Sequence, residues 1–275
     1  RLFDSFILNP NNHLKNDGTP YKVFTPFYKS LNMITTSNSI ETFKQNEKLE
    51  KAEFNYEDGP SFEDLGFIKQ ELPTFLNKDA ITLLDEFKEK IDNYKIDRDF
   101  FYKNASSNIS VHLRFGLISA KEVFNYFKSI ENIDSDFFIR DIFWREFYNY
   151  ILFHYPYSED SNFNKIKIQW NENEELFGKW CEGKTGIPII DAAMIHLNKT
   201  GRMHNRLRMI VASFLTKNLF LDWKRGEKYF ASKLLDYEAS SNIGGWQWSA
   251  STGADASPYR REWKAKDPEK KNKKK

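Results

Sequence analysis

Residues 241–260 read SNIGGWQWSASTGADASPYR and place two tryptophans beside adjacent glycines, an asparagine and a run of small residues. Gly244 and Gly245 can take left-handed backbone angles or let another group approach the backbone closely. Trp246 and Trp248 offer broad aromatic faces, on opposite sides of an extended segment or otherwise at a turn. The stretch predicts either a loop whose aromatic side chains close a helical core, or a surface for flat aromatic ligands at Asn242 and Trp248.

Two segments upstream, 137–153 and 203–221, are apolar around most of their circumference, which is typical of helices at the centre of a large bundle. Each also carries charged or amide residues, and buried charge is costly unless it is paired or binds a ligand. We therefore expect these two helices to form the walls of a polar site. The residues concerned are Asp141, Arg145 and Glu146 in the first segment and Asn205, Arg206 and Arg208 in the second.

Helical spacing of apolar residues starts near Ile81, with no strand–helix alternation and no glycine-rich phosphate loop. The pattern predicts an all-α fold in three parts. Residues 1–80, rich in turn signals, read as an interdomain linker and surface-wrapping segment. Residues 81–259 read as a helical domain, and 260–275 as a basic tail that is solvated or contacts DNA. Because the chain opens on Arg1 with no Met, we expect it to be a piece of a longer protein.

Composition narrows the function only a little. The net charge of +2 neither requires nor excludes a nucleic-acid partner. No apolar run approaches the length of about 20 residues that spans a bilayer, so no membrane partner is expected. The single cysteine, Cys181, excludes an internal disulfide. The histidines show no metal-binding spacing, and we expect no metal site; they are His13, His112, His154, His196 and His204.

Six motifs in fixed order carry a more specific signal: WREFY at 144–148, EGKTG at 182–186, DAAM at 191–194, MHNRLRM at 203–209, GGWQW at 244–248 and STG at 251–253. This set resembles the DNA photolyase and cryptochrome family, closest to the helical FAD-binding domain of cyclobutane pyrimidine dimer photolyases. The resemblance covers roughly residues 3–259 and extends upstream to KVFTPF at 22–27 and SSNIS at 106–110. It implies that the family's N-terminal α/β antenna domain precedes Arg1, so no antenna chromophore is expected in this segment.

The resemblance implies one FAD per chain. The 106–110 loop would begin a helix, capped by a serine or asparagine, whose backbone N–H groups receive the pyrophosphate. Arg208 and Asp236 would pair across the flavin ring, and Asn242 would lie beside flavin N5. The implied cofactor-binding residues are Tyr94, Ser106, Ser107, Asn108, Ile109, Ser110, Phe138, Arg145, Arg208, Asp236, Tyr237, Glu238 and Asn242.

The resemblance also assigns an electron relay and a DNA site. Trp246, Trp223 and Trp170 match the family's chain of tryptophans leading from the flavin to solvent, although three core tryptophans would look the same in sequence. Trp144 and Trp248 would flank a flipped-out dimer, since chemistry on a base requires its removal from the stack. The implied DNA- and substrate-binding residues are Arg98, Asp141, Trp144, Arg145, Tyr148, Asn205, Arg206, Met209 and Trp248.

Four positions depart from the family pattern. Asp141 stands where a substrate-contacting glutamate is usual, and Glu238 where an aspartate is usual. Phe138 and Arg202 each replace a tryptophan, the former lining the flavin in the family. Of these changes, the shorter Asp141 is the one that would loosen contact with a pyrimidine carbonyl.

Together these features predict a carbon–carbon lyase that repairs cyclobutane pyrimidine dimers in DNA by electron transfer from excited, reduced FAD. We expect it to act as a monomer in the cytoplasm, associated with the nucleoid in a prokaryote. The alternatives are a cryptochrome-like photoreceptor that signals through a protein partner, a remnant without activity, and a structural bundle without flavin. Asn242, Asn205 and Trp248 favour repair over signalling, and related plant-type cryptochromes carry aspartate in place of Asn242. Six-four photolyases carry histidine where Asn205 stands, which favours cyclobutane dimers over that other substrate.

Overall fold

The computed structural model describes residues 5–37, 40–42, 59–68, 73–130 and 132–255; the expected tail at 260–275 lies outside them. The described part is helical, as the sequence predicts, and its only β-bridge joins Asn171 to Leu221. The α-helices are α1 Phe24–Ser37, α2 Ala80–Lys88, α3 Tyr94–Asp97, α4 Ser110–Arg114, α5 Ala120–Lys128, α6 Ile133–His154, α7 Glu174–Glu182, α8 Pro188–Thr200, α9 Asn205–Ser213, α10 Trp223–Lys233 and α11 Ala239–Ala250. Shorter elements are the 3₁₀-helices η1 Pro10–Asn12, η2 Thr74–Asn77 and η3 Pro156–Glu159 and the π-helix η4 Phe214–Asn218.

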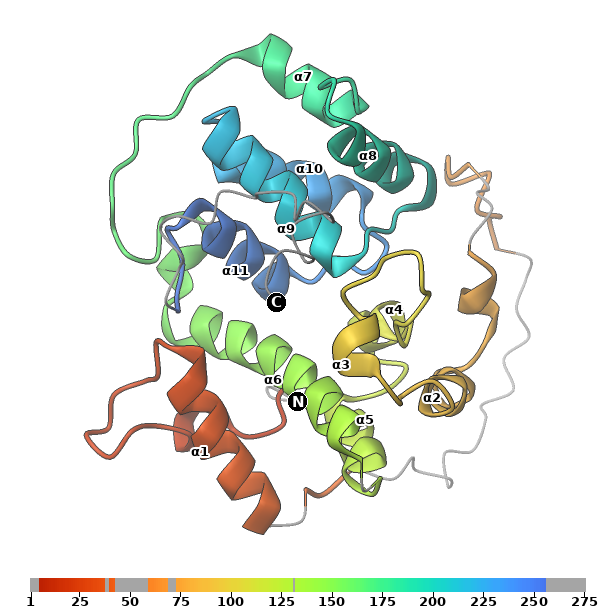
Figure 1. The fold of residues 1–275 in the computed structure, drawn as a ribbon, viewed down its shortest axis with the longest axis vertical. Helices are drawn as coiled ribbons and strands as arrows, with labels where there is room; N and C mark the ends of the chain where they lie inside the picture. Colours follow the sequence, from red (N-terminus) through yellow and green to blue (C-terminus); the bar gives the residue numbers. More distant parts are fainter. Residues whose placement is uncertain (1–4, 38–39, 43–58, 69–72, 131, 256–275) are drawn as a thin grey trace, which may run out of the picture.

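Helix α6 runs through the middle of the molecule and separates two groups of helices (Figure 1). It contacts α1, α3, α5 and α11. Its start is fixed by Asn132, whose side chain accepts a hydrogen bond from the backbone N–H of Asp134. Phe143 and Phe147 are fully buried along it, in accord with the predicted central position.

The first apolar core lies between α1, α2, α5 and α6. Within residues 1–80, expected to be an interdomain linker and surface-wrapping segment, helix α1 contributes to this core, because Phe24, Phe27 and Leu31 are buried on its inner face. Pro26 lies in the first turn of α1, where backbone N–H groups have no helical partners, so proline is tolerated there. Asp255 completes this start by accepting a hydrogen bond from Phe24 N at 3.0 Å.

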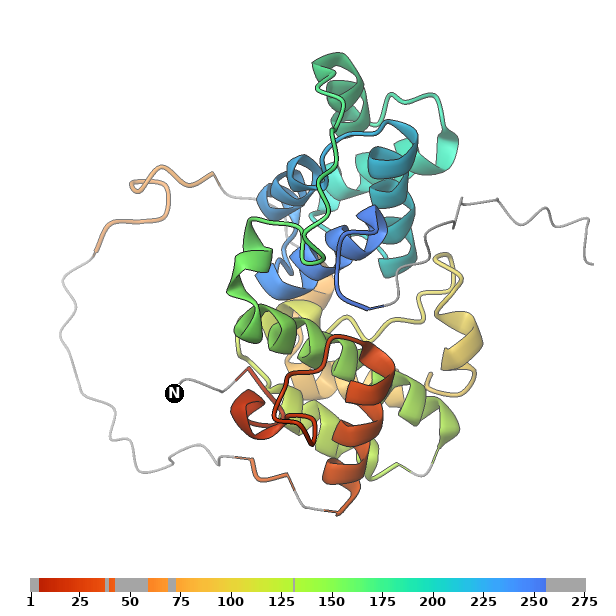
Figure 2. The same ribbon diagram turned by 90° about the vertical axis from the view of Figure 1, so that its left-hand side faces the viewer.

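The second core is built by α7 to α11 around fully buried Trp180 and Trp223. Figures 1 and 2 both show this group at one end of the molecule, with α1 and α5 at the other. The predicted helix over 203–221 is shorter in the structure: α9 begins at Asn205, and the π-helix η4 continues it directly from Phe214 to Asn218. Beyond η4 the chain extends, and Leu221 forms its bridge with Asn171.

The stretch that contains both glycines forms helix α11, so the loop interpretation is wrong. Neither Gly244 nor Gly245 has a left-handed backbone. The close approach predicted for them holds at Gly244, where an added Cβ would lie 2.1 Å from Cδ1 of Tyr148 on α6. Glycine at this position therefore allows α11 to contact α6.

None of the helices in the described ranges is both long enough and apolar enough to cross a membrane.

Candidate functional site

A cavity of about 460 Å³ lies between the chain around α3 and α4 and the start of α9. Asp141 of α6 and Arg206 and Arg208 of α9 contribute to its lining, which confirms that the two long apolar segments wall a polar site. The cavity brings together residues far apart in sequence. Of those predicted, it is lined by Tyr94, Arg98, Ser106, Ser107, Asn108, Ser110, Asp141, Asn205, Arg206, Arg208 and Asp236.

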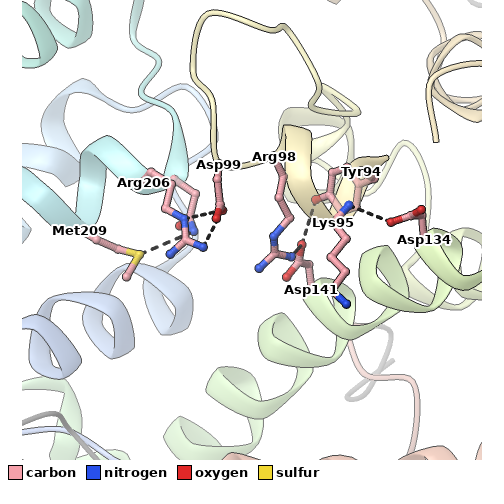
Figure 3. Close-up of polar contacts among 9 residues, drawn as sticks. Tyr94, Lys95, Arg98, Asp99, Asp134, Asp141, Arg206 and Met209 are labelled. Carbon is pink, nitrogen blue, oxygen red and sulfur yellow. Dashed lines mark hydrogen bonds and ion pairs between the residues drawn. The ribbon is translucent and has the colours of Figure 1, made fainter. Parts of the chain in front are cut away.

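Asp141 is held by two partners from the α3 region (Figure 3). The Tyr94 hydroxyl donates to its Oδ2 at 2.8 Å, and Nη1 of Arg98 lies 2.6 Å from the same oxygen. Burial, reinforced by the Asp141 carboxylate, raises the pKa of Tyr94 well above its ordinary value, so its hydroxyl remains a donor. Both bonds end on Oδ2, so Oδ1 has no hydrogen-bond partner among the described residues.

Arg208 and Asp236 form a second ion pair in the cavity lining. Nη2 of Arg208 contacts Oδ1 and Oδ2 of Asp236 at 2.9 and 2.8 Å, while Nε donates to the Met203 carbonyl at 2.8 Å. Burial alone would raise the pKa of Asp236, but Arg208 and the Ser110 hydroxyl outweigh it and hold that pKa below its ordinary value. The predicted pairing is therefore confirmed, while its place across a flavin ring stays a prediction.

The 106–110 loop reaches the cavity through its serines and Asn108. It leads into α4 as predicted, but the cap is wrong: the N-cap residue is Ile109, which is buried and makes no side-chain hydrogen bond. Asn108 has a left-handed backbone with φ of 59°, which asparagine tolerates better than most residues. Its Oδ1 accepts a hydrogen bond from Nη2 of Arg202.

The start of α9 forms the rim of the cavity. Arg206, predicted to contact DNA, pairs with Asp99, whose Oδ1 accepts from Nε at 2.9 Å and Nη2 at 2.6 Å (Figure 3). Asn205 is exposed, and its amide lies 4.0 Å from the sulfur of Met209, which is not part of the cavity lining. The rim is thus polar and accessible, with its arginine already bound to a carboxylate.

Two residues of α6 that were predicted to bind the cofactor lie away from the cavity. Phe138 is buried behind Tyr94, with ring centroids 5.7 Å apart, and also packs on Phe87. Arg145 donates from Nη1 to the Ser5 carbonyl at 3.1 Å. Neither is among the residues lining the cavity, so the structure does not place them with the predicted flavin set.

The predicted dimer-flanking residues Trp144 and Trp248, and Tyr148 beside them, are not among the residues that line the cavity. Trp144 stacks on Phe24 of α1, with centroids 3.6 Å apart and planes at 8°. Tyr148 packs beside it at 5.7 Å and faces Gly244. Trp248 is half-buried on α11. Their roles toward a substrate stay predictions.

Of three predicted cofactor residues in or near α11, Asn242 and Tyr237 share a neighbour that the sequence did not indicate, Glu227. The Asn242 amide donates to Oε1 of Glu227 at 3.0 Å and to its backbone carbonyl at 3.2 Å. The Tyr237 hydroxyl donates to the same Oε1 at 3.2 Å, and burial, together with Glu227, raises the pKa of Tyr237 to about 12. Glu238 caps α11 by accepting from Ser240 N at 3.1 Å. None of the three lines the cavity.

The three relay tryptophans differ in burial. Trp246 and Trp223 are 2% and 1% exposed, whereas Trp170 is half-buried. Trp246 packs edge-on against Trp180 at 5.9 Å, and the indole N–H of Trp223 donates to Asn162 at 2.8 Å. Trp246 and Trp223 are buried and Trp170 is partly accessible, as a path from a buried site to solvent requires. Electron transfer between the three tryptophans stays a prediction.

The sequence model for the FAD binding domain of DNA photolyase matches residues 137–274, half of the chain. The chain belongs to this family.

Similar proteins agree with the family assignment. A deoxyribodipyrimidine photo-lyase from Alkalihalophilus pseudofirmus is 36% identical over 93% of this chain and 55% of its own length. A class III photolyase structure from Agrobacterium tumefaciens is 35% identical with a TM-score of 0.79, covering 93% of this chain and 56% of that one. A Synechocystis cryptochrome structure is 28% identical with a TM-score of 0.76 over the same shares. This photolyase-family chain spans about half the length of the relatives it matches.

The cavity lining suits the family's cofactor. FAD combines flat rings with an anionic pyrophosphate, and the cavity presents four arginines, two carboxylates and the serine loop. Its volume falls within the range of about 300–1,000 Å³ common for small-molecule sites. No group of three or more His, Cys, Asp or Glu in the part of the chain described here is arranged to hold a metal ion.

Several lining residues of this photolyase-family cavity were missed. Phe101 and Asn104 belong to the segment after α3, and His204 caps α9 through Nδ1, which accepts from Arg206 N at 3.2 Å. Arg202 was noticed only as a departure from the family pattern. Its position directly before the polar motif at 203–209 was the available signal that it could belong to the site. No spacing rule, however, connects Arg202 to the 106–110 loop.

Proposed function

We propose that this chain performs light-driven repair of cyclobutane pyrimidine dimers in DNA, as a monomer with one FAD. When bound and reduced, FAD supplies the chemistry: transfer of an electron to the dimer on illumination, and its return once the two linking bonds have opened. The protein's own residues bind the cofactor and the damaged DNA and hold them in place.

The observation that carries this proposal is the convergence on one cavity of side chains from α3, α6 and α9 and from the 106–110 loop. The Arg208–Asp236 pair fixes a positive and a negative group in the lining. Asp141 is held through one oxygen by Tyr94 and Arg98, which leaves the other able to accept from a substrate. Fixed polar groups of this kind can orient a ligand without further rearrangement.

The DNA contacts belong to the rim in this proposal. Arg98 and Arg206 supply positive charge for phosphates or base edges, and Asn205 offers an exposed amide. Trp144 and Trp248 supply aromatic surfaces for a dimer removed from the stack. For Arg206 to take a phosphate, its contact with Asp99 must be exchanged for one with DNA.

The test is a repair assay on an oligonucleotide that contains a pyrimidine dimer, using reduced protein reconstituted with FAD. We expect loss of the dimer in light and none in the dark. A protein that binds FAD but leaves the dimer intact in both conditions would refute repair. A colourless protein after reconstitution would refute flavin binding itself.

A second candidate is a cryptochrome-like photoreceptor, favoured by the similarity to the Synechocystis cryptochrome structure. In that case the flavin would respond to light and the output would be binding to a protein partner. Light-dependent spectral change without repair of the oligonucleotide would favour this function over the first.

A further inference from the structure

The arginines that line the cavity are unequal in their partners. Three of them form ion pairs: Arg98 with Asp141, Arg206 with Asp99, and Arg208 with Asp236. The fourth, Arg202, has no carboxylate within ion-pair distance among the described residues. It is also half-buried, and burial lowers its pKa from the ordinary value. Asp236 is close enough to raise this pKa in part but forms its ion pair with Arg208, so the Arg202 guanidinium has lost part of its hydration without gaining an ion pair of its own.

Arg202 is nevertheless held in a defined position. Its Nη2 donates to Oδ1 of Asn108 in the 106–110 loop. Its guanidinium lies 4.1 Å from the ring centroid of Phe75, close enough for a cation–π interaction. Its backbone N–H donates to Oγ1 of Thr200, the last residue of α8, at 3.2 Å. These contacts fix the side chain beside the serine loop.

A held arginine still has donors to offer. The guanidinium carries five N–H donors, and the described residues take only one of them through a side-chain bond. Arginine binds phosphate groups in a bidentate manner that a lysine cannot reproduce. Ser106 and Ser107 line the cavity on the same loop and can add hydroxyl donors. The missing ion-pair partner is therefore best supplied by a ligand phosphate.

We propose that Arg202 binds the pyrophosphate of FAD, with Asn108 and Phe75 orienting it toward that group. The assignment rests on the proposed function, in which the cavity holds FAD. A phosphate of the DNA backbone offers the same chemistry. The bond to the loop residue Asn108 and the half-buried position favour the cofactor, because DNA phosphates approach from the exposed rim at Arg206.

The experiment compares three flavins: riboflavin, which has no phosphate, FMN, which has one, and FAD, whose pyrophosphate also carries adenosine. Each is titrated into the flavin-free full chain, with binding followed by flavin fluorescence. The variants are Arg202→Gln, which removes the charge, and Arg202→Lys, which keeps it. Arg225→Gln is a matched control, because Arg225 also lies 4.1 Å over a phenyl ring, that of Phe177, but outside the cavity lining.

We expect Arg202→Gln to weaken FAD binding by about 10- to 100-fold, the range for loss of a charge-assisted hydrogen bond. Riboflavin binding should change little, Arg202→Lys should give an intermediate loss for FAD, and Arg225→Gln should leave all three flavins unaffected. The dependence of FAD affinity on salt should become weaker in Arg202→Gln.

Other outcomes would overturn the assignment. Unchanged FAD affinity in Arg202→Gln, or equal losses for FAD and riboflavin, would exclude a pyrophosphate contact. Unchanged FAD affinity with weaker binding of the FAD-loaded variant to dimer-containing DNA would assign Arg202 to the DNA backbone. If the unaltered protein binds none of the flavins, the proposed function itself is wrong. If the unaltered protein binds FAD and only the Arg202 variants behave otherwise than expected, the Arg202 assignment alone is wrong.

Discussion

A methyl group added at position 244 would collide with α6, whereas one added at position 245 would meet nothing. At Gly244 the new Cβ would lie 2.1 and 2.4 Å from Cδ1 and Cε1 of Tyr148. At Gly245 no atom lies within 4 Å of the corresponding Cβ. Gly244→Ala and Gly245→Ala are thus the same chemical change in adjacent positions of one helix, and they isolate the contact between α11 and α6.

The two variants should change stability in opposite directions. Alanine is favoured over glycine inside a helix by about 1 kcal/mol, so Gly245→Ala should raise the free energy of unfolding by roughly that amount. Gly244→Ala gains the same term but must displace the Tyr148 ring or the helix, which for overpacking costs about 1–3 kcal/mol or more. The variants should therefore differ by about 1–3 kcal/mol, or roughly 2–12 °C in melting temperature for a chain of this size.

Urea unfolding followed by circular dichroism measures this difference directly. The contact can be isolated by a double-mutant cycle with Tyr148→Ala: without the ring, alanine at 244 should behave as it does at 245. If both glycine variants stabilise the protein equally, the close approach of α11 to α6 at Gly244 is wrong. If both destabilise it equally, the helical conformation of this stretch is wrong.

Three further predictions concern electron transfer, DNA and pH. Trp246→Phe should slow photoreduction of the flavin strongly but leave repair by chemically reduced protein largely intact; equal loss of both would contradict a relay role. Arg206→Ala should weaken binding to dimer-containing DNA and reduce the slope of log affinity against log salt by about one, whereas an unchanged slope would argue against a phosphate contact. Burial raises the pKa of Glu146 from 4.5 to about 7, so its contribution to stability is full below about pH 4.5 and is lost as the pH rises through about 7. Urea unfolding at pH 5 and pH 8 should show this loss, and Glu146→Gln should remove it.

The all-α fold and the site walls could be predicted because they depend on local patterns. Apolar residues on most faces of a helix predict burial, and charged residues within them need partners. Asp141 and Arg208 followed this logic and line the cavity. Glu146 is also buried, at 3% exposed, and has partners, but it does not line the cavity. It accepts hydrogen bonds from the backbone of Ile7 and Leu8 and so holds the N-terminal segment to α6. A pattern can predict that a buried charge has partners but not which ones.

The rest of the site depends on contacts between distant segments. Nothing near Glu227 in the sequence indicates that the side chains of Asn242 and Tyr237 both donate to its carboxylate. Likewise, the stacking of Trp144 on Phe24 could not be predicted while residues 1–80 were read as a linker. In each case the missing information was the packing of one helix on another, which local propensity does not determine.

The ion pairs divide the cavity into a fixed inner part and an exchangeable rim. Asp236 has a side chain only 13% exposed, and removing either member of its pair with Arg208 would leave a buried charge uncompensated. Asp99 is 49% exposed, and exposed pairs contribute only about 0–1 kcal/mol, so Arg206 can exchange Asp99 for a phosphate at little cost. An inner pair that stays and an outer pair that opens suit a site that keeps its cofactor while DNA binds and leaves. On the proposed function, this difference in burial, more than the number of arginines, determines which contacts a DNA strand could replace.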